Sequence, residues 1–349
     1  MRWVMVTRKL DPADDRAGFV MRWVETLAAR VEHLDVVCQE SANPPLPENV
    51  TAHSMGKETG AGRMAQAGRF TAHLRRTISR ADGVFCHMIP RYVLFAAPWA
   101  RLYRKPLLFW YTHRHASQEL RLANRLADHI LTAAEHSYPL PHPRRHVIGH
   151  GIDANLFPLA EGETEPPAIA TVGRLSSVKR VDWLLRAATQ IADQGTSPDF
   201  RIRIIGGQVD TEADYTVWLH ELAAPLGEAV TFTGPLPHAK VAGELARCAL
   251  AANLSQPGLF DKAALEPMCT GKPVLVTNAD FVPLLGDHAE RLYLPTDATD
   301  ADLAERLAAL LALSPEQRAA IGRDLRDRVL AAHALDGLMD RIVDLMRHA

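Results

Sequence analysis

The stretch SQPGLFDKAALEPMCTGKPVLVTN, residues 255–278, shows most directly how this chain folds. Residues 262–269 contain Ala, Leu, Glu and Met, which favour a helix. Residues 274–276 are apolar and mostly β-branched, as is typical of a buried parallel strand. Four residues interrupt regular structure before the helix and after it: Pro257, Gly258, Gly271 and Pro273. The stretch therefore predicts a loop, a helix, a turn and a strand, which together form one αβ unit.

The predicted helix start is a candidate ligand site. A helix N-terminus presented by a glycine-bearing loop binds phosphate, because free N–H groups and the helix dipole both attract an anion. Glu266 lies one turn inside the helix, where its carboxylate could accept hydrogen bonds from a ribose. From this stretch alone, an ordinary αβ unit with a surface glutamate is the simpler interpretation, since short motifs often match by chance.

Length and composition indicate two globular domains. The chain has 349 residues, of which 47% are hydrophobic, enough for two sizeable cores. Its net charge of −2 and isoelectric point near 6.8 argue against nucleic acid as a partner held by a broad basic field.

Compartment signals favour a cytoplasmic protein. The four cysteines lie far apart in apolar contexts and predict buried free thiols: Cys38, Cys86, Cys248 and Cys269. The N-terminal stretch becomes charged too soon for a signal peptide. Residues 92–111 form the most apolar region, but basic residues interrupt it, so we do not expect a membrane span.

The first half of the chain opens with a predicted strand, helix and strand at residues 3–7, 19–31 and 34–38. This β-α-β opening is typical of a doubly wound α/β fold. It lacks G-x-G-x-x-G, which argues against a dinucleotide site there. Further strands are predicted at 83–87, 107–111, 130–133 and 146–148, with a helix from about residue 92.

Residues 55–80 are basic, rich in glycine and partly helical, with five arginines: Arg63, Arg69, Arg75, Arg76 and Arg80. A solvated helix face is the common explanation for such a run. The alternative is attraction to an anionic acceptor, or peripheral contact with the inner face of a membrane.

Two histidines follow the strand that ends near residue 111. Ligands bind at the carboxyl ends of strands in open α/β sheets, so His113 is well placed for a role in a site. His113 and His115 alternate along an extended chain and could form a metal pair, but no third ligand has suitable spacing.

A second α/β series begins near residue 167. Strands are predicted at 168–172, 202–205, 230–233 and 250–254, with a loop over 173–180 and a helix from 181. The chain from about residue 301 is predicted to be helical. We therefore expect a first domain over residues 1–150 and a second over 151–330, followed by a terminal helix in 331–349 that packs back on the first domain.

Five segments resemble motifs of the GT-B nucleotide-sugar glycosyltransferases, in particular the retaining glycosyltransferase family 4. They are WYTH (110–113), HGIDANLF (150–157), VGRLSSVKRVDWLLRA (172–187), FTGPLPHAKV (232–241) and LEPMCTGKPVLVTN (265–278). The resemblance spans nearly the whole chain. It implies two Rossmann-like domains with doubly wound parallel sheets that face a cleft.

The resemblance also implies roles for single residues. Arg174 and Lys179 would hold the donor diphosphate, because a guanidinium forks onto phosphate oxygens and an ammonium adds a point charge. Glu266 would bind the donor ribose, and His113 would contact the transferred sugar near its reacting carbon. The remaining positions expected to contact the donor are Gly18, Gly173, Gly234, Leu236, Gly258, Leu259, Phe260, Asp261 and Lys262. Without the resemblance, Arg174 and Lys179 would be read as a solvated loop and His113 as an ordinary histidine.

The chain departs from the family at one position. The first glutamate of the family's paired motif lies eight positions before the second, where this chain has Gly258. That glutamate contacts the donor sugar in the family, so the identity of the sugar is the property most affected. Asp261 or Lys262 could take over part of its role.

The resemblance implies a hexosyltransferase that uses no metal and no cofactor. Arg174, Lys179 and the helix start near Asp261 would neutralise the leaving diphosphate. A phosphate oxygen would accept the acceptor's proton as the sugar is transferred with retention. The expected donor is UDP- or GDP-linked, and the acceptor a sugar, lipid or small molecule.

Two other functions remain open. Sugar-nucleotide epimerases share the fold and release free sugar without an acceptor. The replaced first glutamate also allows a non-catalytic protein that binds nucleotide sugars. A likeness of fold does not decide between these functions.

Overall fold

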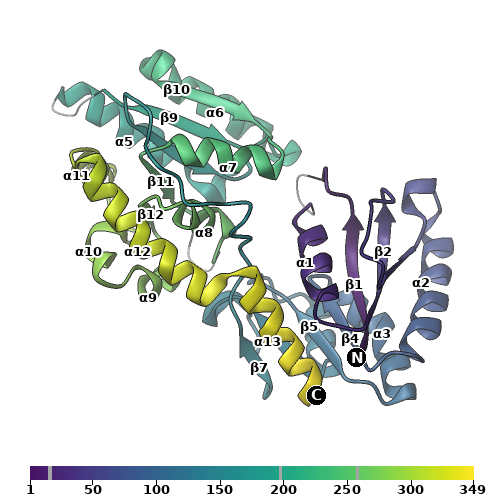
Figure 1. Ribbon diagram of the computed structural model, residues 1–349. Helices are drawn as coiled ribbons and strands as arrows, with labels where there is room; N and C mark the ends of the chain where they lie inside the picture. Colours follow the sequence, from purple (N-terminus) through teal and green to yellow (C-terminus); the bar gives the residue numbers. More distant parts are fainter. Residues whose placement is uncertain (15–17, 196–198, 257–258) are drawn as a thin grey trace. The chain divides into compact units, whose positions relative to one another are not determined.

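The computed structural model describes residues 1–14, 18–195, 199–256 and 259–349. The chain divides into two compact units (Figure 1). Unit 1 comprises Met1–Gly151 together with His333–Ala349, and unit 2 comprises Ile152–Ala332. Each unit contains one parallel sheet and its helices, and each is described by itself.

Unit 1 has a seven-stranded sheet in the order β3-β2-β1-β4-β5-β6-β7, in which all neighbours are parallel. The strands are β1 Arg2–Leu10, β2 His33–Ser41, β3 Val50–Ser54, β4 Gly83–His87, β5 Leu107–Trp110, β6 His129–Thr132 and β7 Arg145–Val147. The helices are α1 Phe19–Ala28, α2 Arg63–Ile78, α3 Pro90–Tyr103, α4 Gln118–Leu126 and α13 Leu335–His348.

The helices of unit 1 pack on apolar side chains that lie on both faces of this sheet. The buried side chains of α2, α3 and α4 pack with Val4, Val84 and Phe109 of the sheet in one core. Because successive residues of a strand point to opposite faces, Trp110 lies on the other face from Phe109. There its ring contacts that of Trp23 of α1 at 5.2 Å. Helix α13 packs on α1, so both faces of the sheet are covered.

Unit 2 has a five-stranded parallel sheet in the order β10-β9-β8-β11-β12. The strands are β8 Ala168–Val172, β9 Arg201–Ile205, β10 Val230–Gly234, β11 Leu250–Asn253 and β12 Val274–Val276. The helices are α5 Val181–Gln194, α6 Ala213–Ala223, α7 His238–Arg247, α8 Lys262–Cys269, α9 Val282–Leu285, α10 Ala289–Leu292, α11 Asp300–Leu311 and α12 Pro315–His333. The last residue of α12, His333, is the first residue of the C-terminal segment that belongs to unit 1.

Most predicted elements occur in the structure. Strands 83–87 and 168–172 and helix 262–269 have the predicted bounds. The predicted loop over 173–180 contains one turn of 3₁₀ helix at Ser177–Lys179. The sequence interpretation missed β3, α4, α6 and α7.

Two other expectations can be compared with the structure. The four cysteines are buried free thiols, as predicted. Over the described ranges, no helix is both long enough and apolar enough to cross a bilayer.

Candidate functional site

The candidate site of unit 2 lies where its strand order reverses. β8 is central, with β9 on one side and β11 on the other, so the chain leaves β8 and β11 in opposite directions. The loops after these two strands meet: the backbone N–H of Gln256 donates to the carbonyl of Val178 at 3.1 Å. This place, beyond the carboxyl ends of parallel strands, is where open α/β sheets bind ligands.

Lys179 and Asp261 join the two loops through an ion pair. The Lys179 ammonium also lies 3.4 Å from the Ser255 hydroxyl. Burial and the neighbouring Arg174 guanidinium lower the pKa of Lys179 to about 8, and the Glu266 carboxylate opposes this shift. Contact with Asp261 also favours the charged ammonium. Lys179 is therefore a partly buried cation already close to two carboxylates.

Asp261 also determines where α8 begins. Its side-chain carboxylate accepts a hydrogen bond from the backbone N–H of Ala263 at 3.1 Å, as an N-cap residue does. The predicted phosphate-binding site at this helix start therefore already contains the carboxylate of Asp261. A phosphate that approached Lys179 from this side would meet the negative charge of Asp261.

Glu266 is held in place by a residue that the sequence interpretation missed. Glu266 is buried, and its Oε1 lies 2.8 Å from Nε2 of His238, the first residue of α7. The His238 ring packs edge-on against Phe157, with centroids 5.1 Å apart. One carboxylate oxygen of Glu266, the residue expected to bind the donor ribose, therefore already contacts an imidazole. The Pro-Leu-Pro-His sequence at the start of α7 offered a weak local signal for this contact.

Arg174 is exposed and lies on the loop over residues 173–180, which follows β8. The Ser177 N–H donates a hydrogen bond to the Glu212 carboxylate at 2.7 Å, and this bond, with a smaller contribution from the charge of Arg174, holds the pKa of Glu212 below its usual range. The guanidinium of Arg174 forms no ion pair among the described residues. Arg174 is thus a solvent-facing cation on the loop that also carries Lys179.

The glycines of the site let strands and loops approach closely. Gly173, Gly206 and Gly234 have φ of 144°, 152° and 69°, values that side chains disfavour. A Cβ at Gly206 would lie 1.8 Å from the carbonyl oxygen of Gly173, and one at Gly173 would lie 3.1 Å from Cε of Lys179. Larger residues would therefore displace the loop that presents Lys179.

The other predicted donor positions differ in their surroundings. Leu236 and Leu259 are half-buried, and Phe260 is buried against Phe281, with ring centroids 4.3 Å apart. Lys262 is half-buried, and burial lowers the pKa of its ammonium to about 8. Gly258 lies outside the described residues.

His113 and Gly18 belong to unit 1, whereas the other predicted site residues belong to unit 2. His113 is exposed just after β5, and its ring lies edge-on to Tyr111 with centroids 5.7 Å apart. Gly18 precedes α1, where a Cβ would lie 2.7 Å from the carbonyl oxygen of Asp14. The part of the chain that the structure describes contains no group of three or more His, Cys, Asp or Glu suited to a metal.

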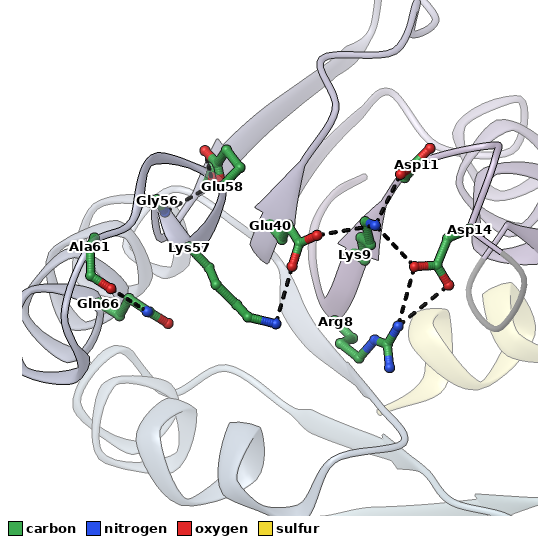
Figure 2. Close-up of polar contacts among 11 residues, drawn as sticks. Arg8, Lys9, Asp11, Asp14, Glu40, Gly56, Lys57, Glu58, Ala61 and Gln66 are labelled. Carbon is green, nitrogen blue, oxygen red and sulfur yellow. Dashed lines mark hydrogen bonds and ion pairs between the residues drawn. The ribbon is translucent and has the colours of Figure 1, made fainter. Parts of the chain in front are cut away.

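Unit 1 has a charged network at the carboxyl ends of β1 and β2, which the sequence interpretation also missed (Figure 2). The Lys9 ammonium lies 3.0 Å from a carboxylate oxygen of each of Asp11, Asp14 and Glu40. Lys57 also pairs with Glu40, at 3.1 Å. The three carboxylates raise the pKa of Lys9, and the two lysines lower the pKa of Glu40. This network connects Asp11 and Asp14, which follow β1, with Glu40 of β2.

Comparison with known proteins adds a family resemblance to this geometry. Residues 166–313 match the model of the family Glycosyl transferases group 1. The D-inositol 3-phosphate glycosyltransferase of Nocardia farcinica is 34% identical over 156 residues, which cover 44% of this chain and 34% of that protein. The MMP alpha-(1->4)-mannosyltransferase of Mycolicibacterium hassiacum is 27% identical over 243 residues, 66% of this chain and 56% of that protein. The chain therefore matches only part of these curated relatives.

Solved structures share the fold over the whole chain. The crystal structure of Anabaena Alr3699/HepE in complex with UDP and glucose has a TM-score of 0.75 and 19% identity, and the match covers 100% of both chains. Sucrose-phosphate synthase from Thermosynechococcus elongatus has a TM-score of 0.77 and 18% identity, covering 100% of this chain and 98% of that one. The predicted GT-B fold is confirmed, and so is the predicted resemblance to glycosyl transferases group 1.

Proposed function

We propose that this chain, which resembles glycosyl transferases group 1 and has a GT-B fold, transfers a hexose from a nucleoside-diphosphate sugar to a hydroxyl acceptor. The observation that supports this proposal most strongly is the contact of Lys179 with Asp261, the N-cap of α8, where the strand order of unit 2 reverses. The buried Glu266 lies one helical turn further along α8. A cation, a helix start and a buried carboxylate suit the diphosphate and the ribose of one nucleotide.

In the proposed reaction, the bond between the anomeric carbon and the diphosphate oxygen breaks while an acceptor oxygen bonds to that carbon. The acceptor's proton passes to a diphosphate oxygen of the leaving group. Arg174 and Lys179 stabilise the negative charge that develops on that group, so the proposed transfer uses no metal. Retention of the anomeric configuration, and contact of His113 with the sugar, are further parts of the proposal. The configuration of the product by NMR tests retention.

The proposed donor is UDP- or GDP-linked. UDP is supported by the Anabaena neighbour, whose crystal structure contains UDP and glucose. Thermal-shift measurements with UDP, GDP and ADP distinguish the bases, because a ligand that binds the folded state raises its melting temperature. The acceptor remains a sugar, lipid or small molecule.

Substitution of the two anchoring residues tests the proposal. We expect Lys179→Ala and Glu266→Gln each to lower transfer by about 100-fold or more, since each removes a charged contact to the donor. Lys240→Ala and Glu221→Gln change the same residue types at exposed positions of unit 2 and should retain wild-type activity. Wild-type turnover by a folded Lys179→Ala protein would contradict the proposal that Lys179 holds the donor diphosphate.

Product analysis separates the two alternatives. A sugar-nucleotide epimerase would release free sugar without an acceptor, and a non-catalytic protein would bind nucleotide and leave the donor intact. The epimerase alternative is based on the shared fold, and the non-catalytic alternative on Gly258, which stands where the family has a glutamate.

A further inference from the structure

Positive charge is concentrated in one segment of unit 1. Residues 61–127 contain twelve Lys and Arg but only two Asp and Glu, a net charge of +10, whereas the whole chain has a net charge of −2. Such an asymmetry creates a local field that the net charge conceals. The segment contains α2, α3 and α4, the three helices that share a core on one face of the sheet.

These helices form one continuous layer. α3 packs against both α2 and α4, and their apolar side chains point into the shared core. Their other sides form the surface that we call the α2–α4 face. Its exposed cations are Arg63, Arg69, Arg75, Arg76, Arg91, Arg101, Arg121 and Arg125, with Arg80 and Arg104 just after helix ends and the half-buried Lys105 next to Arg104.

Most of this charge is not neutralised by carboxylates. Arg91 pairs with Glu119 at 2.6 Å. Arg76 instead contacts the imidazoles of His53 and His73, at 3.2 and 3.4 Å. Arg101, Arg104 and Lys105, at the end of α3, form no ion pair within the described ranges.

Large apolar side chains are exposed on the same three helices. Met64, Phe95, Leu102 and Leu122 are 87%, 39%, 64% and 47% exposed. On α3, Arg91, Phe95, Pro98 and Leu102 are exposed at i, i+4, i+7 and i+11, so they form one stripe along the helix. The stripe lies opposite the buried side chains of α3 and therefore points away from the sheet.

We propose that the α2–α4 face docks on an anionic lipid bilayer. Arginines attract acidic headgroups, and Phe95 and Leu102 enter the boundary between headgroups and acyl chains. This combination of basic and apolar side chains is characteristic of helices that lie on membranes. The proposal does not depend on the proposed transferase activity.

The exposed apolar side chains favour a bilayer over the other occupants of a basic surface. A solvated helix face explains the arginines, but it does not account for Phe95 and Leu102 in one exposed stripe with Arg91 on α3. Nucleic acid would attract the same cations, but it offers no hydrocarbon for an aliphatic side chain. An anionic bilayer satisfies both kinds of residue at one surface.

Binding to lipid vesicles tests the proposal with the full chain. We expect it to bind mixed phosphatidylcholine–phosphatidylglycerol vesicles and not vesicles of phosphatidylcholine alone. Binding should weaken strongly between about 0.1 and 1 M salt, as the screening length falls from ~10 to ~3 Å. Arg101→Gln/Arg104→Gln/Lys105→Gln should lower the partition coefficient by roughly 100-fold, since each cation near an anionic surface contributes about 1 kcal/mol.

Matched variants separate this face from general charge. Arg201→Gln/Arg247→Gln/Arg291→Gln removes three exposed cations of unit 2 and should retain binding. Leu102→Ser should weaken binding, whereas Val217→Ser, which alters another exposed apolar side chain, should not. Absence of binding at low salt, or equal binding by the wild type and the α3 variants, would overturn the proposal. Tighter binding to transfer RNA than to vesicles, with the same dependence on α3, would overturn it in favour of nucleic acid.

Discussion

Asp261 is the residue whose role changes most once its contacts are known. Its carboxylate caps α8 and pairs with Lys179, the cation proposed to hold the donor diphosphate. Two like charges about 4 Å apart repel by roughly 4 kcal/mol near a protein surface. In the proposed function, Asp261 would therefore compete with the donor diphosphate for Lys179.

Asp261→Asn should bind UDP or GDP about tenfold more tightly than the wild type, measured by titration calorimetry. Asparagine caps a helix as well as aspartate does, so the melting temperature should change little. Glu212→Gln removes the same charge from the loop near Arg174 without touching Lys179, and should have a smaller effect. Weaker binding by Asp261→Asn would show instead that the carboxylate contacts the nucleotide or its sugar.

His333 should make the stability of the protein fall in acid. Burial and the nearby Arg341 lower the pKa of His333 from 6.5 to about 4. The unfolded chain therefore binds a proton that the folded chain rejects, so stability is fully present above pH 6.5 and is lost as the pH falls toward 4. Between neutral pH and pH 5 this loss amounts to about 2 kcal/mol. His333→Asn should reduce the loss by that amount in denaturant titrations, and an unchanged pH dependence would contradict the assignment.

At the scale of elements, local pattern predicted the strands and helices with strong apolar signals. β8 and α8 are such cases, since nearly every residue of both is buried. β3 was missed because Val50 is its only buried residue, and its other side chains are partly or fully exposed. α4 does have a distinct apolar face, with Leu120 and Ala123 buried among charged residues, but the helix has only nine residues. Short elements offer few repeats of a periodic pattern from which to recognise them.

The contacts of the site could not be predicted in the same way. Lys179 meets Asp261 across 82 residues, and His238 meets Glu266 across 28. These pairs depend on the order of strands in the sheet, which brings the loops after β8 and β11 together. Motif resemblance predicted Lys179 and Glu266 as site residues, but it could not predict the partners that they have in this chain.

Gly173 follows β8 and Gly206 follows β9, and the backbone of the two glycines is in close contact. This contact gives a prediction at the scale of elements. Gly206→Ala places a Cβ 1.8 Å from the carbonyl oxygen of Gly173, and neither backbone can move without displacing its strand. Alanine at a φ of 152° adds strain of about 1–3 kcal/mol. We expect a lower melting temperature and weaker nucleotide binding.

Gly243→Ala is the matched control for Gly206→Ala. Gly243 lies inside α7 with open space around its Cα, so alanine should stabilise the helix by up to about 1 kcal/mol. Similar effects of the two substitutions, measured by thermal denaturation, would contradict the steric explanation.

At the scale of the whole molecule, unit 1 is discontinuous in sequence and unit 2 is not. The chain completes the seven-stranded sheet of unit 1, forms the whole of unit 2 and then returns as α13. α13 is attached to unit 1 by polar as well as apolar contacts. Arg30 pairs with Asp336 and Asp340 at 2.9 and 2.6 Å, and Arg341 donates to the carbonyl of Ile148 at 2.9 Å.

Deletion of residues 333–349 should therefore unfold unit 1. α13 buries six apolar side chains: Leu335, Leu338, Met339, Ile342, Val343 and Met346. At about 1.5–3 kcal/mol for each, their loss is on the order of 10 kcal/mol, comparable with the whole stability of a typical domain. Unit 2 keeps its own sheet and core, so the truncated chain should retain one unfolding transition and its nucleotide-induced thermal shift. A separate peptide of residues 333–349 should restore the lost transition, because the other side of the interface, around Trp23 and Gly151, is unchanged. Retention of both transitions by the truncated chain would mean that the first 151 residues fold without their last helix.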